Sequence, residues 1–185
     1  MTRISALLFL LVFCSATAMQ AQASPPVPKP DPAMKKMTLF TGHWTLEGGY
    51  RPGPLGPGGR VTDEWTGRMI LNGFFFERRV KGKRPSGDFE FVDIDWYDPN
   101  TKSLTYAVYQ DNGHVDSGVF AFEGNACIVK SKRTVGGKQY ETRGTCAFAA
   151  DGMSLTYKGE FSPDGKTWTV YFEGKGTKVL PAPKK

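Results

Sequence analysis

The 185-residue sequence predicts an all-β protein, built as an antiparallel up-and-down β-barrel of about ten strands with a short N-terminal helix. Helical periodicity is almost absent, turn-forming residues recur about every 10 to 15 residues, and the segments between them alternate apolar and polar side chains. A meander this long leaves two exposed edges, and closure into a barrel removes both. A two-sheet sandwich is the alternative fold.

The N-terminal segment, residues 1–23, has the pattern of a secretory signal peptide. Arg3 gives a positive start, residues 6–15 form an apolar run, and residues 21–23 read Ala-Gln-Ala, a small-x-small cleavage site. The apolar run is too short for a membrane span, which needs about 20 residues. A lipid anchor on Cys14 is the weaker alternative. We therefore expect a secreted or periplasmic protein.

The rest of the chain divides into a linker, one domain and a tail. Residues 24–32 are rich in proline and predict an extended linker. Residues 33–179 are long enough for one sizeable core and form the predicted barrel domain, and residues 180–185 are a tail. The formal net charge is +6, but the basic residues are scattered, so we expect no nucleic-acid binding.

Each predicted element lies between recognisable turn signals. A short helix should begin at Asp31 or Pro32 and end before Gly42. Ten strands should follow, at residues 43–50, 60–71, 74–82, 88–97, 103–110, 115–123, 126–134, 138–148, 153–161 and 167–178. The strongest hairpin signal is Asn72-Gly73 between two apolar runs.

The Asn72-Gly73 turn sets the register of its hairpin. The inward pairs should be Met69–Phe76 and Trp65–Val80, and the outward pairs Arg68–Glu77 and Glu64–Lys81. In the last two strands, alternation places one apolar set inside: Leu155, Tyr157, Gly159, Phe161, Trp168, Val170 and Phe172.

The first predicted strand begins with Gly42-His43-Trp44. Trp44 should point inward and close the barrel end under the helix, while Gly42 allows the backbone to turn sharply. Gly48-Gly49 should permit a bend or close packing.

Three stretches carry a resemblance to known proteins: residues 39–44, 70–74 and 96–101. Gly42-x-Trp44 resembles the opening motif of the calycins, the group of lipocalins and fatty-acid-binding proteins. The whole sequence is similar to an exported bacterial domain family of unknown function with a lipocalin-like barrel, over roughly residues 37–176. The resemblance implies a calycin-type barrel with an internal cavity, and it implies no established activity.

The expected function is non-enzymatic binding of a small apolar or amphipathic ligand in this cavity. Candidate ligand-binding residues share the inward face: Trp65, Met69, Phe76, Arg78, Tyr157 and Phe172. Inside the barrel Arg78 needs a partner. Asp63 should supply it structurally; alternatively Arg78 anchors an acidic head group, with room left by Gly67 opposite. The resemblance to fatty-acid-binding proteins also implies an interior arginine that holds a carboxylate.

Catalytic and metal chemistry find little support in the sequence. The two histidines are His43, which should face outward, and His114, which lies at a turn. Haem is not expected, because the similar nitrobindins carry their axial histidine late in the chain, whereas no histidine follows His114 here. Asp93 and Asp95 should face solvent, since the alternate residues Val92, Ile94 and Trp96 make the better core set. We therefore expect no cofactor.

A second functional hypothesis is a structural or protein-interaction module of the cell envelope with a filled barrel. Ile70 and Phe75 motivate it, because they should lie on the outer face near a hairpin tip, where a protein partner would cover them.

A disulfide between Cys127 and Cys146 is also predicted. Counting outward from the Gly136-Gly137 turn places the two cysteines directly opposite each other, and export supplies an oxidising compartment. By the same count they form a hydrogen-bonded pair with a Cα spacing of about 5.5 Å, within disulfide range but with less close side chains than at the other pair type.

Overall fold

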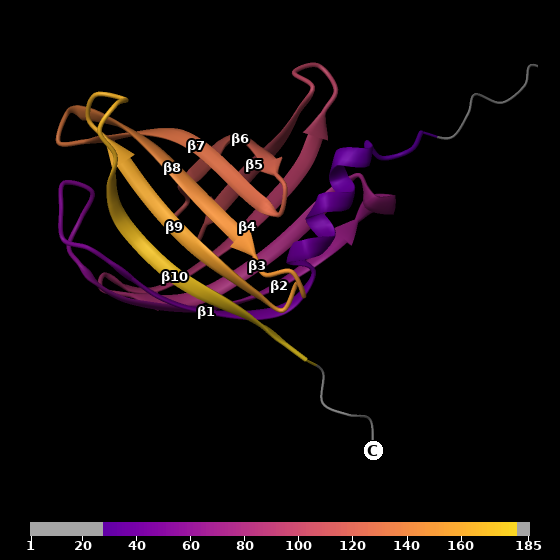
Figure 1. The fold of residues 1–185 in the computed structure, drawn as a ribbon, viewed down its shortest axis with the longest axis horizontal. Coiled ribbons are helices and arrows are strands. Elements are labelled where there is room, and N and C mark those ends of the chain that lie inside the picture. The colour runs from indigo at the N-terminus through magenta and orange to yellow at the C-terminus, as the bar shows by residue number, and fades with distance from the viewer. Residues whose placement is uncertain (1–27, 181–185) are drawn as a thin grey trace, which may run out of the picture.

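Ten antiparallel strands close into one barrel, with a short helix across one end (Figure 1). The computed structural model describes residues 28–180; the predicted signal peptide, the first four linker residues and residues 181–185 lie outside this range. The elements are η1 (Pro32–Phe40), β1 (Gly42–Tyr50), β2 (Gly59–Ile70), η2 (Leu71–Gly73), β3 (Phe75–Arg84), β4 (Gly87–Asp98), β5 (Ser103–Gln110), β6 (Val115–Glu123), β7 (Ala126–Val135), β8 (Lys138–Phe148), β9 (Ser154–Ser162) and β10 (Thr169–Val179).

The topology is the predicted one. Each strand pairs with its neighbours in sequence, and β1 pairs with both β2 and β10, which closes the barrel. This closure confirms the up-and-down barrel and excludes the two-sheet sandwich. All ten predicted strands are present, and their ends lie within two residues of the predicted ends.

The N-terminal helix η1 is a 3₁₀-helix that covers the barrel end, where it contacts β2, β3 and β4. The Asp31 side chain accepts a 2.8 Å hydrogen bond from the Ala33 N–H, and Pro32 occupies the first helical position, where its missing N–H costs nothing. The side chains that η1 buries are Met34, Met37 and Phe40.

The chain passes from η1 into β1 as predicted. Gly42 has φ of +98°, a conformation that other residues adopt only with strain. Trp44 is fully buried and stacks on Trp65 of β2, with ring centroids 5.5 Å apart. Gly48 serves close packing, because a Cβ there would lie 2.6 Å from the Glu173 carbonyl oxygen of β10.

The β2–β3 hairpin has the predicted register, with Trp65 opposite Val80 and Met69 opposite Phe76. The turn itself is longer than predicted. Ile70 and Phe75 are the last pair, and Leu71, Asn72 and Gly73 all have positive φ. A four-residue connection replaces the two-residue turn without changing the register.

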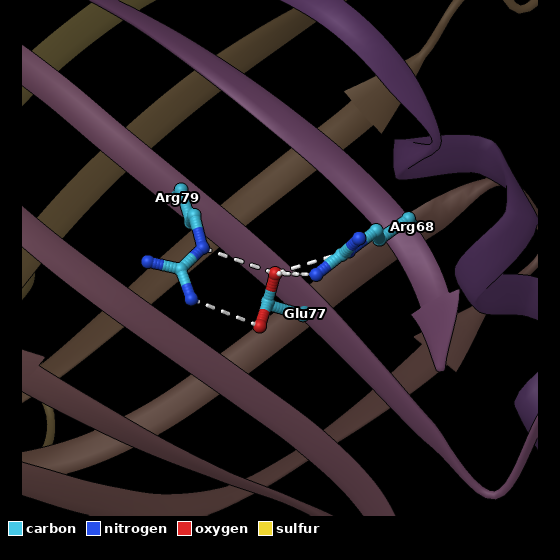
Figure 2. A network of polar contacts seen from close by, with 3 residues as sticks. All are labelled: Arg68, Glu77 and Arg79. Atoms are coloured by element: carbon cyan, nitrogen blue, oxygen red, sulfur yellow. Dashed lines mark hydrogen bonds and ion pairs between the residues drawn. The ribbon is translucent and has the colours of Figure 1, made fainter. Parts of the chain in front are cut away.

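The outer face of this hairpin carries a three-residue ionic network (Figure 2). Figure 2 shows Arg68 and Arg79 on either side of the Glu77 carboxylate. The N···O distances are 2.9 Å from Arg68 and 3.1 Å from Arg79. The hydrogen bond from Arg79 lowers the pKa of Glu77 against the opposing effect of burial. The predicted Arg68–Glu77 pair is therefore confirmed. Glu64 and Lys81 are opposite in register, but Glu64 pairs with His43 and Lys81 with Glu90.

The last strand departs from the predicted alternation. A register shift between Val170 and Phe172 lets both Tyr171 and Phe172 border the interior. Trp168 precedes β10 and does not enter the core. The Arg143 guanidinium lies over the indole ring of Trp168, 4.2 Å from the ring centre. A β-bulge inserts one unpaired residue and so reverses the parity of the faces.

Candidate functional site

Two adjacent spaces of about 200 and 250 Å³ lie inside the barrel. We call the smaller one, bordered by Asp93 and Asp95, the acidic space, and the larger one, bordered by Trp65 and Phe172, the aromatic space. The residues that border both are Phe40, Arg78, Val108, Cys146, Tyr157 and Tyr171. The barrel interior therefore offers two compartments with a shared boundary, one with two carboxyl groups in its wall and one with several aromatic rings beside Asp63.

Five of the six candidate ligand-binding residues border these spaces. Trp65 and Phe172 line the aromatic space, Phe76 lines the acidic space, and Arg78 and Tyr157 line both. Met69 borders neither, and it packs half-buried against the core.

The Arg78 side chain is one of the six that border both spaces. It projects inward from β3, and its guanidinium lies 5.7 Å from the Phe40 ring centre and 5.9 Å from that of Trp65. Its ion-pair partner is Asp93 on β4. Burial lowers the pKa of Arg78, but the nearby carboxylates of Asp93 and Asp95 outweigh it and raise the pKa above its usual value.

The predicted Asp63–Arg78 bond is not formed, because Arg78 sits directly opposite Asp93 and pairs there. One oxygen of Asp63, Oδ1, is buried without a hydrogen-bond partner. The space around Gly67 also differs from the prediction. A Cβ at Gly67 would lie 2.4 Å from the Phe40 carbonyl oxygen and 2.6 Å from the Phe76 ring, so the space opposite Arg78 is filled and not free for a ligand.

Replacement of the buried Asp63 should change the stability of the protein in a way that depends on pH. Burial raises its pKa to about 6, against the lowering influence of Arg78. A carboxyl with a raised folded-state pKa destabilises the protein above that pKa, and the penalty disappears as the pH falls towards the unfolded value of about 3.9. Asp63→Asn should raise the free energy of unfolding by about 1–3 kcal/mol at pH 7 and leave it unchanged near pH 4. Urea denaturation at both pH values measures this; equal effects at both would contradict it.

Asp93 and Asp95 are inside the barrel, contrary to the prediction that they face solvent. Their side chains come from β4, where Asp93 is 3% and Asp95 6% exposed, whereas Val92, Ile94 and Trp96 point outward. The pairing of β3 with β4 causes this, because Asp93 lies opposite Arg78 and Asp95 opposite Phe76, both of which face inward. Directly opposite residues share a face of the sheet.

The electrostatics of this carboxyl pair are dominated by desolvation. Burial raises the pKa of Asp93, although Arg78 opposes the shift. Burial and then the neighbouring Asp93 charge raise the pKa of Asp95 well above its ordinary range. Asp93 Oδ1 and Arg78 Nε are both buried without a hydrogen-bond partner. Such unpaired buried atoms are costly unless a ligand or water satisfies them.

The two cysteines have the predicted register but not the predicted disulfide. Cys127 on β7 lies opposite Cys146 on β8, and both are free thiols. The hydrogen-bonded pair type keeps the side chains further apart than the alternative type does. Burial also raises the pKa of the Cys146 thiol to about 12, from 9.0, which suppresses the thiolate that oxidation requires.

Both thiols should therefore react slowly in the folded protein. A rise in pKa from 9.0 to about 12 lowers the thiolate fraction about a thousandfold. We expect an aromatic disulfide reagent to titrate two thiols, those of Cys127 and Cys146, promptly in denaturant and far more slowly in the native state. Absence of both thiols in denatured, unreduced protein lacking residues 1–23 would contradict the free-thiol state.

No group of three or more His, Cys, Asp or Glu side chains within residues 28–180 has a geometry suited to a metal ion. In the same range no helix is long and apolar enough to cross a membrane. His43 lies 3.4 Å from Glu64 on the outer face, where both side chains are largely exposed.

The outer face near the β2–β3 turn is apolar, as expected for Ile70 and Phe75. Both are half-buried, and Phe75 packs against Trp96 with ring centroids 6.5 Å apart. The same face continues through Ile94 and Val92 of β4 to Tyr109 of β5, which is 51% exposed.

Comparison with known proteins supports the fold. No family model matches the sequence, and no curated protein matches it. The structure is similar to the crystal structure of Rv2717c from M. tuberculosis, with a TM-score of 0.54 and 10% sequence identity, over 82% of this chain and 100% of that one. A de novo designed fluorescence-activating β-barrel matches with a TM-score of 0.41 and 12% identity, over 77% of this chain and 96% of that one. Similarity to Rv2717c at this identity establishes the barrel fold alone.

Proposed function

We propose that this protein is an exported, non-enzymatic barrel that binds one small amphipathic molecule in its interior. The observation that carries the proposal is a two-part cavity in which buried polar atoms of Asp63, Trp65, Arg78 and Asp93 lack partners. The two spaces, taken together, reach the range of ligand pockets, roughly 300–1,000 Å³. A fully packed core leaves neither such volume nor such unpaired atoms.

The chemistry of the walls supports an amphipathic ligand. The aromatic space offers Trp65, Phe172 and Leu155 to an apolar body, while the acidic space offers carboxyl and hydroxyl groups to a polar end. The proposal of export rests on the N-terminal sequence, whose pattern is that of a secretory signal peptide. We propose the periplasm or the cell exterior as the location.

Binding of a neutral fluorescent dye tests this proposal. We expect N-phenyl-1-naphthylamine to bind with one site per barrel. Val108 borders both spaces, so the indole ring of Val108→Trp should occupy part of them and weaken dye binding by at least about tenfold, or 1.4 kcal/mol. Val119→Trp is the matched control, because Val119 lies on the outer face of the adjacent strand and is 49% exposed. No dye binding by the wild type, or equal binding by both variants, would refute the interior site.

The outward-facing apolar side chains of β3 and β4 support a second candidate function, a protein-interaction module. Phe75, Ile94 and Trp96 lie together on the outside of β3 and β4, where apolar groups usually need a cover. Native mass spectrometry of protein purified from its own cells separates the two candidates. A bound small molecule supports the ligand carrier, whereas a bound protein that is lost with Phe75→Ser supports the interaction module.

A further inference from the structure

We infer that the ligand of this cavity carries a protonated amine, held by Asp95 and the free oxygen of Asp93. The inference rests on the proposed function and specifies its ligand class. It replaces the acidic head group that the sequence suggested for Arg78, because that guanidinium already has a carboxylate partner.

The balance of charge in the acidic space favours a cation. Among residues 28–180, two arginines border this space. Arg78 pairs with Asp93 through Oδ2, whereas Arg143 of β8 pairs with Glu160 and lies over the Trp168 ring. Asp93 Oδ1 is buried and unpaired, and among the described residues no ion pair involves Asp95, which lies opposite the apolar ring of Phe76. Arg143 is therefore engaged by Glu160, and Arg78 alone pairs with the two acidic groups of this space, so a ligand cation would balance them.

Apart from Arg78, and from Arg143, which is paired with Glu160, the groups around Asp95 are not cations. Asp95 is flanked by Phe76 and Arg78 of β3, Asp93 of its own strand and Tyr106 of β5. Across the space lie Cys127 of β7, Cys146 of β8 and Tyr157 of β9. Burial raises the pKa of the two thiols and both tyrosines, so these groups are neutral near pH 7.

A primary ammonium matches the acceptors that the acidic space offers. It has three N–H donors, and Asp95, Asp93 Oδ1 and the hydroxyl groups of Tyr106, Ser131 and Thr142 border the same space. An acid would instead bring a further negative charge to the two buried carboxyl groups, at a large desolvation cost. An apolar tail would extend past Arg78 into the aromatic space.

Binding of an amine should be linked to a proton on Asp95. Burial and the Asp93 charge raise the pKa of Asp95 in the empty barrel, whereas a bound ammonium favours the carboxylate form. Amine binding therefore releases a proton. Affinity should increase as the pH rises, until the amine itself loses its proton near the usual value of about 10 for an alkyl ammonium.

Three probes with one tail length test the inference: decylamine, decanol and decanoate, each displacing N-phenyl-1-naphthylamine. A hydrogen bond to a charged group contributes about 1.5–3 kcal/mol, so decylamine should bind roughly 10–100-fold more tightly than decanol, with decanoate the weakest. Asp95→Asn should reduce the affinity for decylamine to that for decanol. Asp88→Asn, the same substitution on the outer end of β4, should behave as the wild type.

The outcomes separate this inference from the proposed function. Equal affinity for decylamine and decanol, or tighter binding of decanoate, overturns the amine class but leaves the cavity as a binding site. Failure of the dye and all three probes to bind overturns both. Decylamine affinity that rises between pH 5.5 and 8.5 in the wild type, and is flat in Asp95→Asn, supports the inference. A flat wild-type profile contradicts it. Thermal melts check folding, and Asp95→Asn should melt no lower than the wild type because it removes a buried acid.

Discussion

Replacement of Trp44 by alanine should lower the free energy of unfolding by about 3–5 kcal/mol. Trp44 is 0% exposed, stacks on Trp65 with an interplanar angle of 5°, and meets the edge of Phe148 at 6.0 Å. Its indole N–H donates a 3.2 Å hydrogen bond to the Thr41 carbonyl at the end of η1. The substitution removes the largest fully buried side chain of the barrel and opens a cavity under the helix.

Urea denaturation of both proteins measures this effect, and Trp168→Ala is the matched control. Trp168 is half-buried outside the core and stacks on Arg143, so its loss should cost no more than about 1 kcal/mol. A loss for Trp44→Ala as small as for the control would show that Trp44 does not close the barrel.

Arg78→Met should lower the free energy of unfolding by about 3–5 kcal/mol at pH 7, because it leaves the Asp93 carboxylate buried without a cation. The deficit should shrink as the pH falls. Without Arg78 the folded-state pKa of Asp93 rises further above its unfolded value, so the penalty is present above that folded pKa and is relieved by protonation below it. Denaturation midpoints between pH 4 and 8 measure the change.

The double variant Arg78→Met/Asp93→Leu provides the decisive comparison. Replacing both partners of a buried ion pair by apolar groups is often neutral or stabilising, so the double variant should recover most of the loss. Arg79→Met is the control on the same strand. Arg79 pairs with Glu77 on the outer face, with its side chain 56% exposed, and its loss should cost less than about 1 kcal/mol. A double variant no more stable than Arg78→Met would contradict the structural Arg78–Asp93 pair.

The barrel could be predicted because each local signal constrains a neighbouring pair of strands. A hairpin turn fixes which residues are opposite, as Gly136-Gly137 did for Cys127 and Cys146. The outward pair Arg68–Glu77 followed from Asn72-Gly73 in the same way, although that connection is longer than two residues. The register of a hairpin stays the same when the connection gains one residue from each strand.

The prediction that Asp93 and Asp95 face solvent is wrong because β4 carries its apolar side chains on the outer face of the barrel. From Val92 to Trp96 the apolar side chains face outward and the acidic ones inward, so alternation alone assigns the wrong face. The signal that could have found them is the Pro85-Ser86 turn. Counting outward from it pairs Arg84 with Gly87 and hence Arg78 with Asp93. An inward Arg78 therefore requires an inward Asp93.

Other features of the site depend on contacts that sequence patterns do not record. The space beside Gly67 is filled by the Phe40 carbonyl of η1, a segment distant in sequence from β2. The inward position of Tyr171 depends on the register shift in β10, and no turn signal marks that shift. Burial of a polar cluster is likewise a property of the assembled barrel, since it needs walls from β3, β4, β5, β7 and β8 together.

The most direct test of this account is an NMR titration of the side-chain carboxyl carbons of Asp93 and Asp95, with and without saturating decylamine. Asp95→Asn assigns the signals. We predict that the pair titrates well above the ordinary aspartate value of about 3.9 in the empty barrel, and that the amine shifts its titration to lower pH. Titration near the ordinary value, unchanged by the amine, would contradict both the buried acidic cluster and its role in binding a cationic ligand.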